Sequence, residues 1–250
     1  MKNLTVTLFL VLFTFSFIFP QTSKIHVAIF EDIGAHKHGT ENVSLSLADS
    51  TIFTIQVVSA EDIRAGRLKQ FDVLVEPGGL GSQQAKSLEA SGLEEIRNFV
   101  KRGGGYLGIC AGAYLSTNFY KWSLGILNAW VVDREHWNRG SGDIVLQLTP
   151  AGKDFFEVSF DTIVVQYNQG PLLTPGVSDS VTDYTSLAKF KSEIAEKGAP
   201  TGVMIGTDAI GMGEFGAGRV ISISPHFEKR AEQRYFISKA VKWLSHKKTK

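Results

Sequence analysis

The chain of 250 residues carries 26 Lys and Arg against 25 Asp and Glu, so its formal net charge is +1. Since Lys2 is one of the basic residues, the chain after residue 23 holds 25 of each sign. This balance lacks the basic excess of nucleic-acid-binding and acidic-membrane-binding proteins, so we expect neither partner. The single cysteine excludes an internal disulfide and is a candidate reactive thiol.

The first segment has the form of a secretory signal. Lys2 precedes an almost wholly apolar run at residues 4–19, and polar residues follow it. No Ala-x-Ala cleavage site is present, so an uncleaved membrane anchor stays open. We therefore expect a signal peptide or N-terminal anchor at residues 1–23. The protein would be secreted or periplasmic, or membrane-anchored if the segment is retained.

Residues 24–109 alternate between strand and helix patterns. The predicted strands are 24–30, 51–58, 71–75 and 106–109. The predicted helices are 39–49, a short one capped by Ser59 and ended by Gly66, and 82–102. Such alternation with short connections predicts an α/β fold whose mostly parallel sheet has helices on both faces.

The second half is less regular. Strand-like segments are predicted at 125–132, 143–148, 162–167, 186–191, 200–205, 209–214 and 219–224, and a closing helix at 228–245. No linker-like composition separates the halves, so residues 24–250 are predicted to form a single domain.

The one cysteine lies in a Gly-x-Cys-x-Gly pattern. Gly108, Cys110 and Gly112 follow a short apolar run and precede a helical pattern, which is the arrangement of a nucleophile elbow. A helix N-terminus would favour the thiolate of Cys110 over the thiol. The alternative is a small buried residue on a core strand.

A histidine and a carboxylate late in the chain could serve this thiol. His226 follows the strand predicted at 219–224, and Glu228 comes two residues later. A thiol nucleophile needs a base, and the base needs an acceptor on its other nitrogen. Cys110, His226 and Glu228 are therefore predicted to form a catalytic triad. Taken alone, His226 could equally cap a loop, and Glu228 could favour the start of a helix.

These motifs resemble the class I glutamine amidotransferase-like superfamily. A Pro-Gly-Gly turn at 77–79, the elbow and the late His-x-Glu occur in the order of that superfamily. The sequence is most similar to the domain at the N-terminus of biotin–protein ligases, through the stretches 103–114, 136–140, 167–171 and 218–228. The resemblance implies a flavodoxin-like domain with Cys110 as nucleophile, His226 as base and Glu228 as its orienting group.

Acyl transfer also needs donors for the developing oxyanion. The backbone N–H of Ala111 is one candidate, and that of Gly79 or Gly78 is the other. Tyr114 occupies the position where glutamine-hydrolysing members carry a substrate-holding Gln, so glutaminase activity is disfavoured. The loops 136–139 and 167–169 hold polar and aromatic residues suited to a pocket. His36 and His38 lack partners for a zinc set, so no metal and no cofactor are expected.

Two classes of function follow. The first is an exported thiol hydrolase acting on an amide, peptide or related carbonyl substrate through the Cys-His-Glu triad. The second is a binding module that keeps the fold and uses the crevice to hold a small-molecule or peptide ligand. A carbohydrate-linked relative, such as the trehalose-utilisation-like branch, is a variant of the first. The motifs do not identify the substrate, because substrate choice depends on loop shape.

Overall fold

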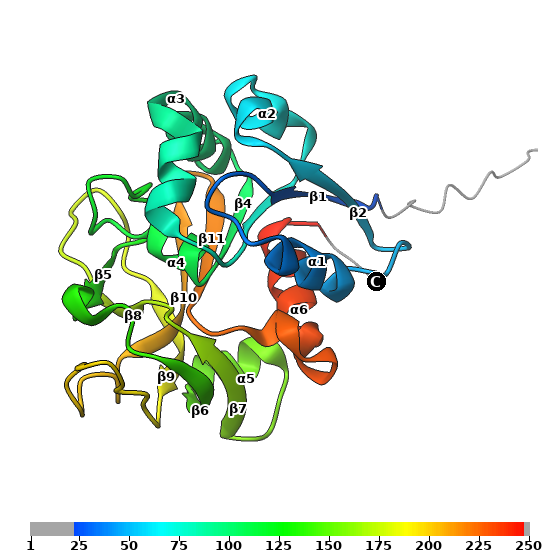
Figure 1. Ribbon diagram of the computed structural model, residues 1–250. Coiled ribbons are helices and arrows are strands. Elements are labelled where there is room, and N and C mark those ends of the chain that lie inside the picture. Colours follow the sequence, from blue (N-terminus) through cyan, green and yellow to red (C-terminus); the bar gives the residue numbers. More distant parts are fainter. Residues whose placement is uncertain (1–22, 248–250) are drawn as a thin grey trace, which may run out of the picture.

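The computed structural model describes residues 23–247, and Figure 1 shows their arrangement. The predicted signal segment therefore lies almost wholly outside the described residues. Within them, no helix combines the length and apolar character needed to cross a membrane. The strands are β1 Ile25–Phe30, β2 Phe53–Val58, β3 Val73–Glu76, β4 Gly105–Ile109, β5 Ala129–Val132, β6 Ser141–Leu148, β7 Thr162–Asn168, β8 Leu172–Pro175, β9 Thr185–Phe190, β10 Asp208–Phe215 and β11 Gly218–Ile223. The helices are α1 Lys37–Ser46, α2 Ala60–Arg64, α3 Gly81–Lys101, α4 Ala111–Ser116, α5 Pro150–Phe156 and α6 Arg234–Leu244.

The described strands join one sheet of eleven strands. Its main path runs β2-β1-β3-β4-β11-β10-β9-β6-β7, and β8 pairs with both β5 and β10 beside that path. Neighbours from β2 to β11 are parallel, whereas those from β11 to β7 are antiparallel. The predicted α/β fold is confirmed, and the parallel half contains all the strands that lead into the predicted triad.

Helices cover both faces of the parallel half (Figure 1). Alternate residues of β1 show this, because Ile25, Val27 and Ile29 belong to one core cluster, and Ala28 and Phe30 to the other. The first cluster also contains apolar residues of α1, α5 and α6, and the second those of α2, α3 and α4. Burial on both faces explains why the central parallel strands β3 and β4 are buried along their whole length, whereas the edge strand β2 has exposed positions.

Several predicted boundaries differ from the structure. Residues 200–205 are turns instead of a strand, with Gly202 at φ 80°, a backbone angle that strands do not adopt. The strand predicted at 125–132 is limited to β5. Helix α3 is interrupted at Glu89, whose φ is 58°. The closing helix begins at Arg234, because two short 3₁₀ turns occupy 227–233. Helix α5 and strand β8 were not predicted.

The parallel strands β3, β4 and β11 bring three motifs to one edge of the sheet. β4 lies between β3 and β11, and the carboxyl ends of all three point the same way. The turn at residues 77–79 follows β3, Cys110 follows β4, and His226 comes shortly after β11. The carboxyl edge of a parallel sheet is where the crevices of α/β proteins lie.

Candidate active site

Cys110 lies on a strained turn between β4 and α4. Its φ is 52° and its ψ is −98°, which an L-residue adopts only when its surroundings hold it there. The backbone N–H of Cys110 donates to the carbonyl of Ile223, at 2.8 Å. A Cβ on Gly108 would lie 2.3 Å from the carbonyl oxygen of Gly112, and one on Gly112 would lie 2.2 Å from that of Glu76. Both flanking positions therefore require glycine, as the elbow motif predicts.

His226 and Glu228 form a buried pair. His226 Nδ1 lies 2.7 Å from Glu228 Oε1, and the two side chains are 5% and 1% exposed. Burial alone would lower the pKa of His226, but the negative charges of Glu228 and Cys110 outweigh it and raise this pKa to about 10. The imidazolium is therefore the stable form of His226 near neutral pH, with its charge balanced by Glu228.

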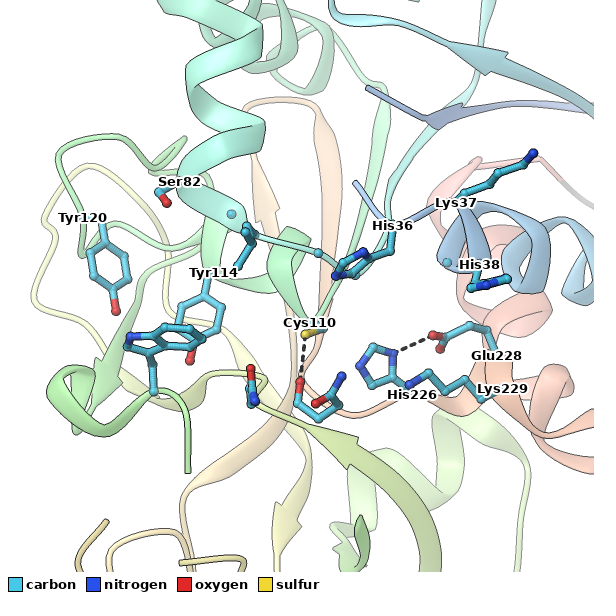
Figure 2. Close-up of a pocket in the computed structure, with 18 of the residues that line it drawn as sticks. His36, Lys37, His38, Ser82, Cys110, Tyr114, Tyr120, His226, Glu228 and Lys229 are labelled. Carbon is cyan, nitrogen blue, oxygen red and sulfur yellow. Dashed lines mark hydrogen bonds and ion pairs between the residues drawn. The ribbon is translucent and has the colours of Figure 1, made fainter. Parts of the chain in front are cut away.

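The imidazole of His226 lies between Cys110 and Glu228 (Figure 2). Gly78 fits closely against the same ring, because a Cβ added there would lie 3.0 Å from His226 Cε1 and 3.7 Å from Cys110 Cβ. Among the described residues, Nε2 of His226 has no hydrogen-bond partner. Contact with Cys110 is one of the causes that raise the pKa of His226, so the sulfur is the group with which this buried nitrogen can exchange a proton.

The sulfur of Cys110 has a second polar neighbour. Its Sγ lies 3.3 Å from the carbonyl oxygen of Asn168, to which a thiol can donate. A thiolate cannot make that hydrogen bond and is instead attracted by the imidazolium of His226. The sulfur thus has a backbone carbonyl as one polar neighbour and the buried His226 as the other.

The predicted oxyanion donors lie around the elbow. Ala111 is the first residue of α4, where backbone N–H groups have no partner inside the helix. Gly78 and Gly79 line the cavity. Gly79 also has a packing reason to be glycine, because a Cβ there would lie 1.9 Å from the carbonyl oxygen of Gly34. The need for glycine at residue 79 therefore comes from this contact, and its oxyanion role stays a prediction.

A cavity of about 750 Å³ contains Cys110, His226 and Glu228 in its wall. Tyr114, at the position of the missing Gln, also lines it, and burial raises the pKa of its hydroxyl well above the usual value. The ring centre of Tyr114 lies 6.1 Å from that of Tyr120. Tyr120 in turn stacks on Trp122 with centroids 4.6 Å apart, so one wall of the cavity is aromatic.

The loops predicted to line the pocket contribute only in part. Trp137, Asn168 and Gln169 do line the cavity. Arg139 is instead buried and paired with Asp133, which also lies 2.6 Å from the imidazole of His136. The hydroxyl of the buried Tyr167 donates to the carbonyl of Gly170. Arg139, His136 and Tyr167 thus hold the loops in shape rather than face the cavity.

Sequence reasoning missed several residues of the cavity wall. Lys37, Arg134, Tyr120, Trp122 and Lys229 belong to it, but they come from separate segments and share no motif. His36 and His38, weighed only as metal ligands, also line it. No group of three or more His, Cys, Asp or Glu within residues 23–247 is arranged to hold a metal ion.

Comparison with known proteins supports the resemblance and the fold. The family model described as biotin-protein ligase, N terminal, matches residues 25–138, which include the elbow but not His226 or Glu228. No curated protein matches the chain. The structure is similar to ThuA-like proteins from Parabacteroides merdae (TM-score 0.57, 13% identity, 91% of this chain and 93% of that one) and Bacteroides uniformis (0.56, 12%, 92% and 95%).

A β-galactosidase from Bacillus circulans sp. alkalophilus is similar in one part (TM-score 0.55, 12% identity, 88% of this chain). This chain spans only 31% of that enzyme. At such low identities the structural matches establish the fold alone. The chain is thus similar to the N-terminal domain of biotin-protein ligases over residues 25–138, on a glutamine amidotransferase-like α/β fold.

Proposed function

We propose that the chain is an exported thiol-dependent hydrolase that cleaves an amide, peptide or related carbonyl substrate. One observation carries this proposal: a buried His226–Glu228 pair shares a cavity with a cysteine held on a strained elbow. Nothing in the packing of a core cysteine calls for a positive φ or for an ionised histidine beside it. Activated nucleophiles do need these features.

The proposed reaction has two stages. The Cys110 thiolate attacks the substrate carbonyl carbon, and the oxyanion that forms accepts hydrogen bonds from the N–H groups of Ala111 and Gly79 or Gly78. The carbon–nitrogen bond then breaks as the His226 imidazolium gives its proton to the departing amine, leaving a thioester on Cys110. Water attacks the thioester, His226 takes a proton from that water, and a carboxylic acid leaves as the thiolate is restored.

Glu228 has a supporting role in this scheme. Its Oε1 accepts from Nδ1 of His226, so Nε2 is the nitrogen that faces the reaction. The negative charge of Glu228 stabilises the imidazolium that each stage uses. Tyr114 cannot supply the paired amide groups of a Gln side chain, so glutamine is a disfavoured substrate.

A binding module is the second candidate, and the contact between Cys110 and Asn168 favours it. A thiol that donates to a backbone carbonyl, at 3.3 Å, is held in its neutral, unreactive form. On this alternative, the cavity holds a ligand without breaking a bond. The two candidates differ in whether a substrate becomes attached to the sulfur.

Trapping of the acyl-enzyme tests the choice. We expect a reactive aryl ester to acylate the wild-type protein in a single turnover, with intact mass showing one added acyl group. Cys110→Ala should lose at least ~1000-fold in rate, and His226→Ala nearly as much. The double variant should lose little more than Cys110→Ala, because no thiol remains to be activated. Full acylation of Cys110→Ala would contradict the hydrolase and favour the binding module.

Export is a separate part of the proposal. The apolar run at residues 4–19 supports it. We expect a mature protein that starts near Lys24 and lies outside the cytoplasm, and intact mass of the exported form measures its start. A full-length chain in the membrane fraction would show an anchor, and a full-length chain in the cytoplasm would contradict export.

A further inference from the structure

The charge of the cavity wall differs from that of the whole chain. Lys37, Arg134 and Lys229 line the cavity, and Glu228 is the only acid that does so. The side chain of Glu228 is 1% exposed and already bonded to His226. The chain as a whole balances 26 basic against 25 acidic residues. The cationic character of the cavity is therefore local and does not reflect the composition.

The three cations are free to meet a ligand. None of them forms an ion pair with another residue of the described range 23–247. Lys37 and Arg134 are exposed, and Lys229 is half-buried in the 3₁₀ turn directly after Glu228. A concave wall lined by charges of one sign concentrates the opposite sign inside it.

The cavity has two chemically different sides around Cys110. Figure 2 shows Tyr114 and Tyr120 on one side of the sulfur, and Lys37, His38 and Lys229 on the other. The aromatic side continues through the stacked pair of Tyr120 and Trp122. Stacked rings offer a flat apolar surface, on which another flat group packs. A molecule centred on the sulfur would meet aromatic rings, with Arg134 close to Tyr120, at one end and Lys229 at the other.

We propose that the substrate is an acyl compound with a negatively charged group, such as a carboxylate, on one side of the scissile carbonyl and a flat or aromatic group on the other. Lys229 would receive the anion, and Tyr114, Tyr120 and Trp122 the flat group. Calling this compound a substrate rests on the proposed hydrolase function. The recognition itself depends only on the cavity wall and holds for a bound ligand as well.

Alkylation by a matched pair of reagents tests the charge around Cys110. Iodoacetate is anionic and iodoacetamide is neutral, and both react with the one thiol of the protein. We expect the iodoacetate-to-iodoacetamide rate ratio to exceed that of a neutral small thiol by about 10-fold at low salt. About 0.5 M salt should remove most of this excess. His226 contributes to the ratio, so the lysines need their own variants.

Lysine variants separate the cavity from the general charge of the protein. Lys229→Gln should lower the ratio by about 3-fold, and Lys37→Gln by less, because its ammonium points away from the sulfur (Figure 2). Lys86→Gln removes the same charge from an exposed position on α3 and should leave the ratio unchanged. A ratio equal to that of the small thiol, or an equal fall in all three variants, would overturn the proposed anion recognition.

Equilibrium binding gives a readout that needs no reaction. In Cys110→Ala, we expect N-benzoylglycine to bind about 10-fold more tightly than N-benzoylglycinamide, which has the same ring but no charge. Lys229→Gln should remove most of that preference. Equal binding of the two probes would overturn the anion side of the proposal.

The two readouts separate the failures. A binding preference in a protein whose Cys110 resists acylation by the ester would refute the hydrolase and keep the anion recognition. Rapid acylation without a charge preference in either readout would keep the hydrolase and refute the anion recognition.

Discussion

The surroundings of Glu76 and of Glu228 differ in one partner, although both side chains are buried near the carboxyl edge of the sheet. Oε1 of Glu228 accepts from the His226 imidazole at 2.7 Å. Both carboxyl oxygens of Glu76 lack a hydrogen-bond partner among residues 23–247, and burial raises its pKa well above the usual 4.5. A contact with the His226 imidazole therefore distinguishes the buried Glu228 from the buried Glu76, whose pKa burial raises.

This comparison also separates packing from chemistry. Glu76 ends β3, directly before the turn at 77–79, and its side chain lies against Gly112 of α4. As a neutral acid, Glu76 packs against the elbow and makes no hydrogen bond to the imidazole. Glu228 sits beyond the imidazole and serves as its charged acceptor. Substitutions at the two residues should therefore change different properties of the protein.

Among the substitutions that test this comparison, Glu228→Gln should have the largest effect. Removing the negative charge takes away the largest influence that raises the pKa of His226, so this pKa should fall from about 10. Acylation by the ester should slow by about 100-fold, less than in Cys110→Ala. NMR titration of His226 measures the first effect and single-turnover kinetics the second. An unchanged titration would contradict the assigned pair, and Glu76→Gln is the control that should leave it unchanged.

The same pair predicts a pH window of stability. The folded-state pKa of His226 is raised above its usual 6.5, so the pair stabilises the fold fully below pH 6.5 and loses that contribution as the pH rises through about 10. Urea unfolding of the wild type across this window should show the loss. Glu228→Gln should lack it.

A smaller effect of opposite sign is expected at Glu76. In the unfolded chain Glu76 loses its proton near pH 4.5, while in the folded protein it keeps it, so folding is penalised as the pH rises above that value. The penalty grows by about 1.4 kcal/mol per pH unit until the folded pKa is reached. Glu76→Gln should therefore gain stability relative to the wild type as the pH rises from ~4 to ~7.

The measurement for Glu76 is urea unfolding of the two proteins at several pH values. The pH dependence of the difference is the decisive quantity, because a buried amide has its own desolvation cost at every pH. A difference that stays constant from acid to neutral pH would show that Glu76 is charged in the folded protein.

The smallest effect is expected from a substitution at Gly78, which lies in the turn that follows Glu76. An added Cβ would lie 3.0 Å from His226 Cε1, so Gly78→Ala should shift the ring slightly. We expect about 10-fold slower acylation with little change in stability. Gly142→Ala is the matched control, because its Cβ would make only an ordinary contact of 3.4 Å with Ile194. Equal rates for the two variants would contradict a tightly fitted imidazole.

The sequence predicts the parallel half of the fold and the elbow well, for a physical reason. Strands buried on both faces, such as β3 and β4, are almost continuously apolar, and glycine at 108 is imposed by its contact with Gly112, four residues later. Both signals are local, whereas glycine at 112 is imposed by the distant Glu76. The His226–Glu228 contact was inferred from its two-residue spacing, and the structure has it at 2.7 Å.

The remaining features depend on contacts between distant segments. The turns at 200–205 look like a strand because Val203, Met204 and Ile205 form a short apolar run, but Gly202 and Gly206, each at φ 80°, break the extended chain. The closing helix starts late because residues 227–233 form the turns that hold the pair. The cavity wall combines Lys37, Tyr120 and Lys229 from three parts of the chain, and no motif connects them.

The place of β11 in the sheet has a consequence for how the protein matures. This strand follows every other described strand along the chain, yet it lies between β4 and β10 and joins the parallel half to the antiparallel half. Its pairing with β4 spans more than a hundred residues, a long-range contact of the kind that forms slowly. Cys110 cannot acquire its base before β11 is in place, since the histidine comes only three residues after that strand. A partly synthesised or partly folded chain therefore lacks the contact between the elbow and the buried His226–Glu228 pair, which forms only when β11 joins the sheet.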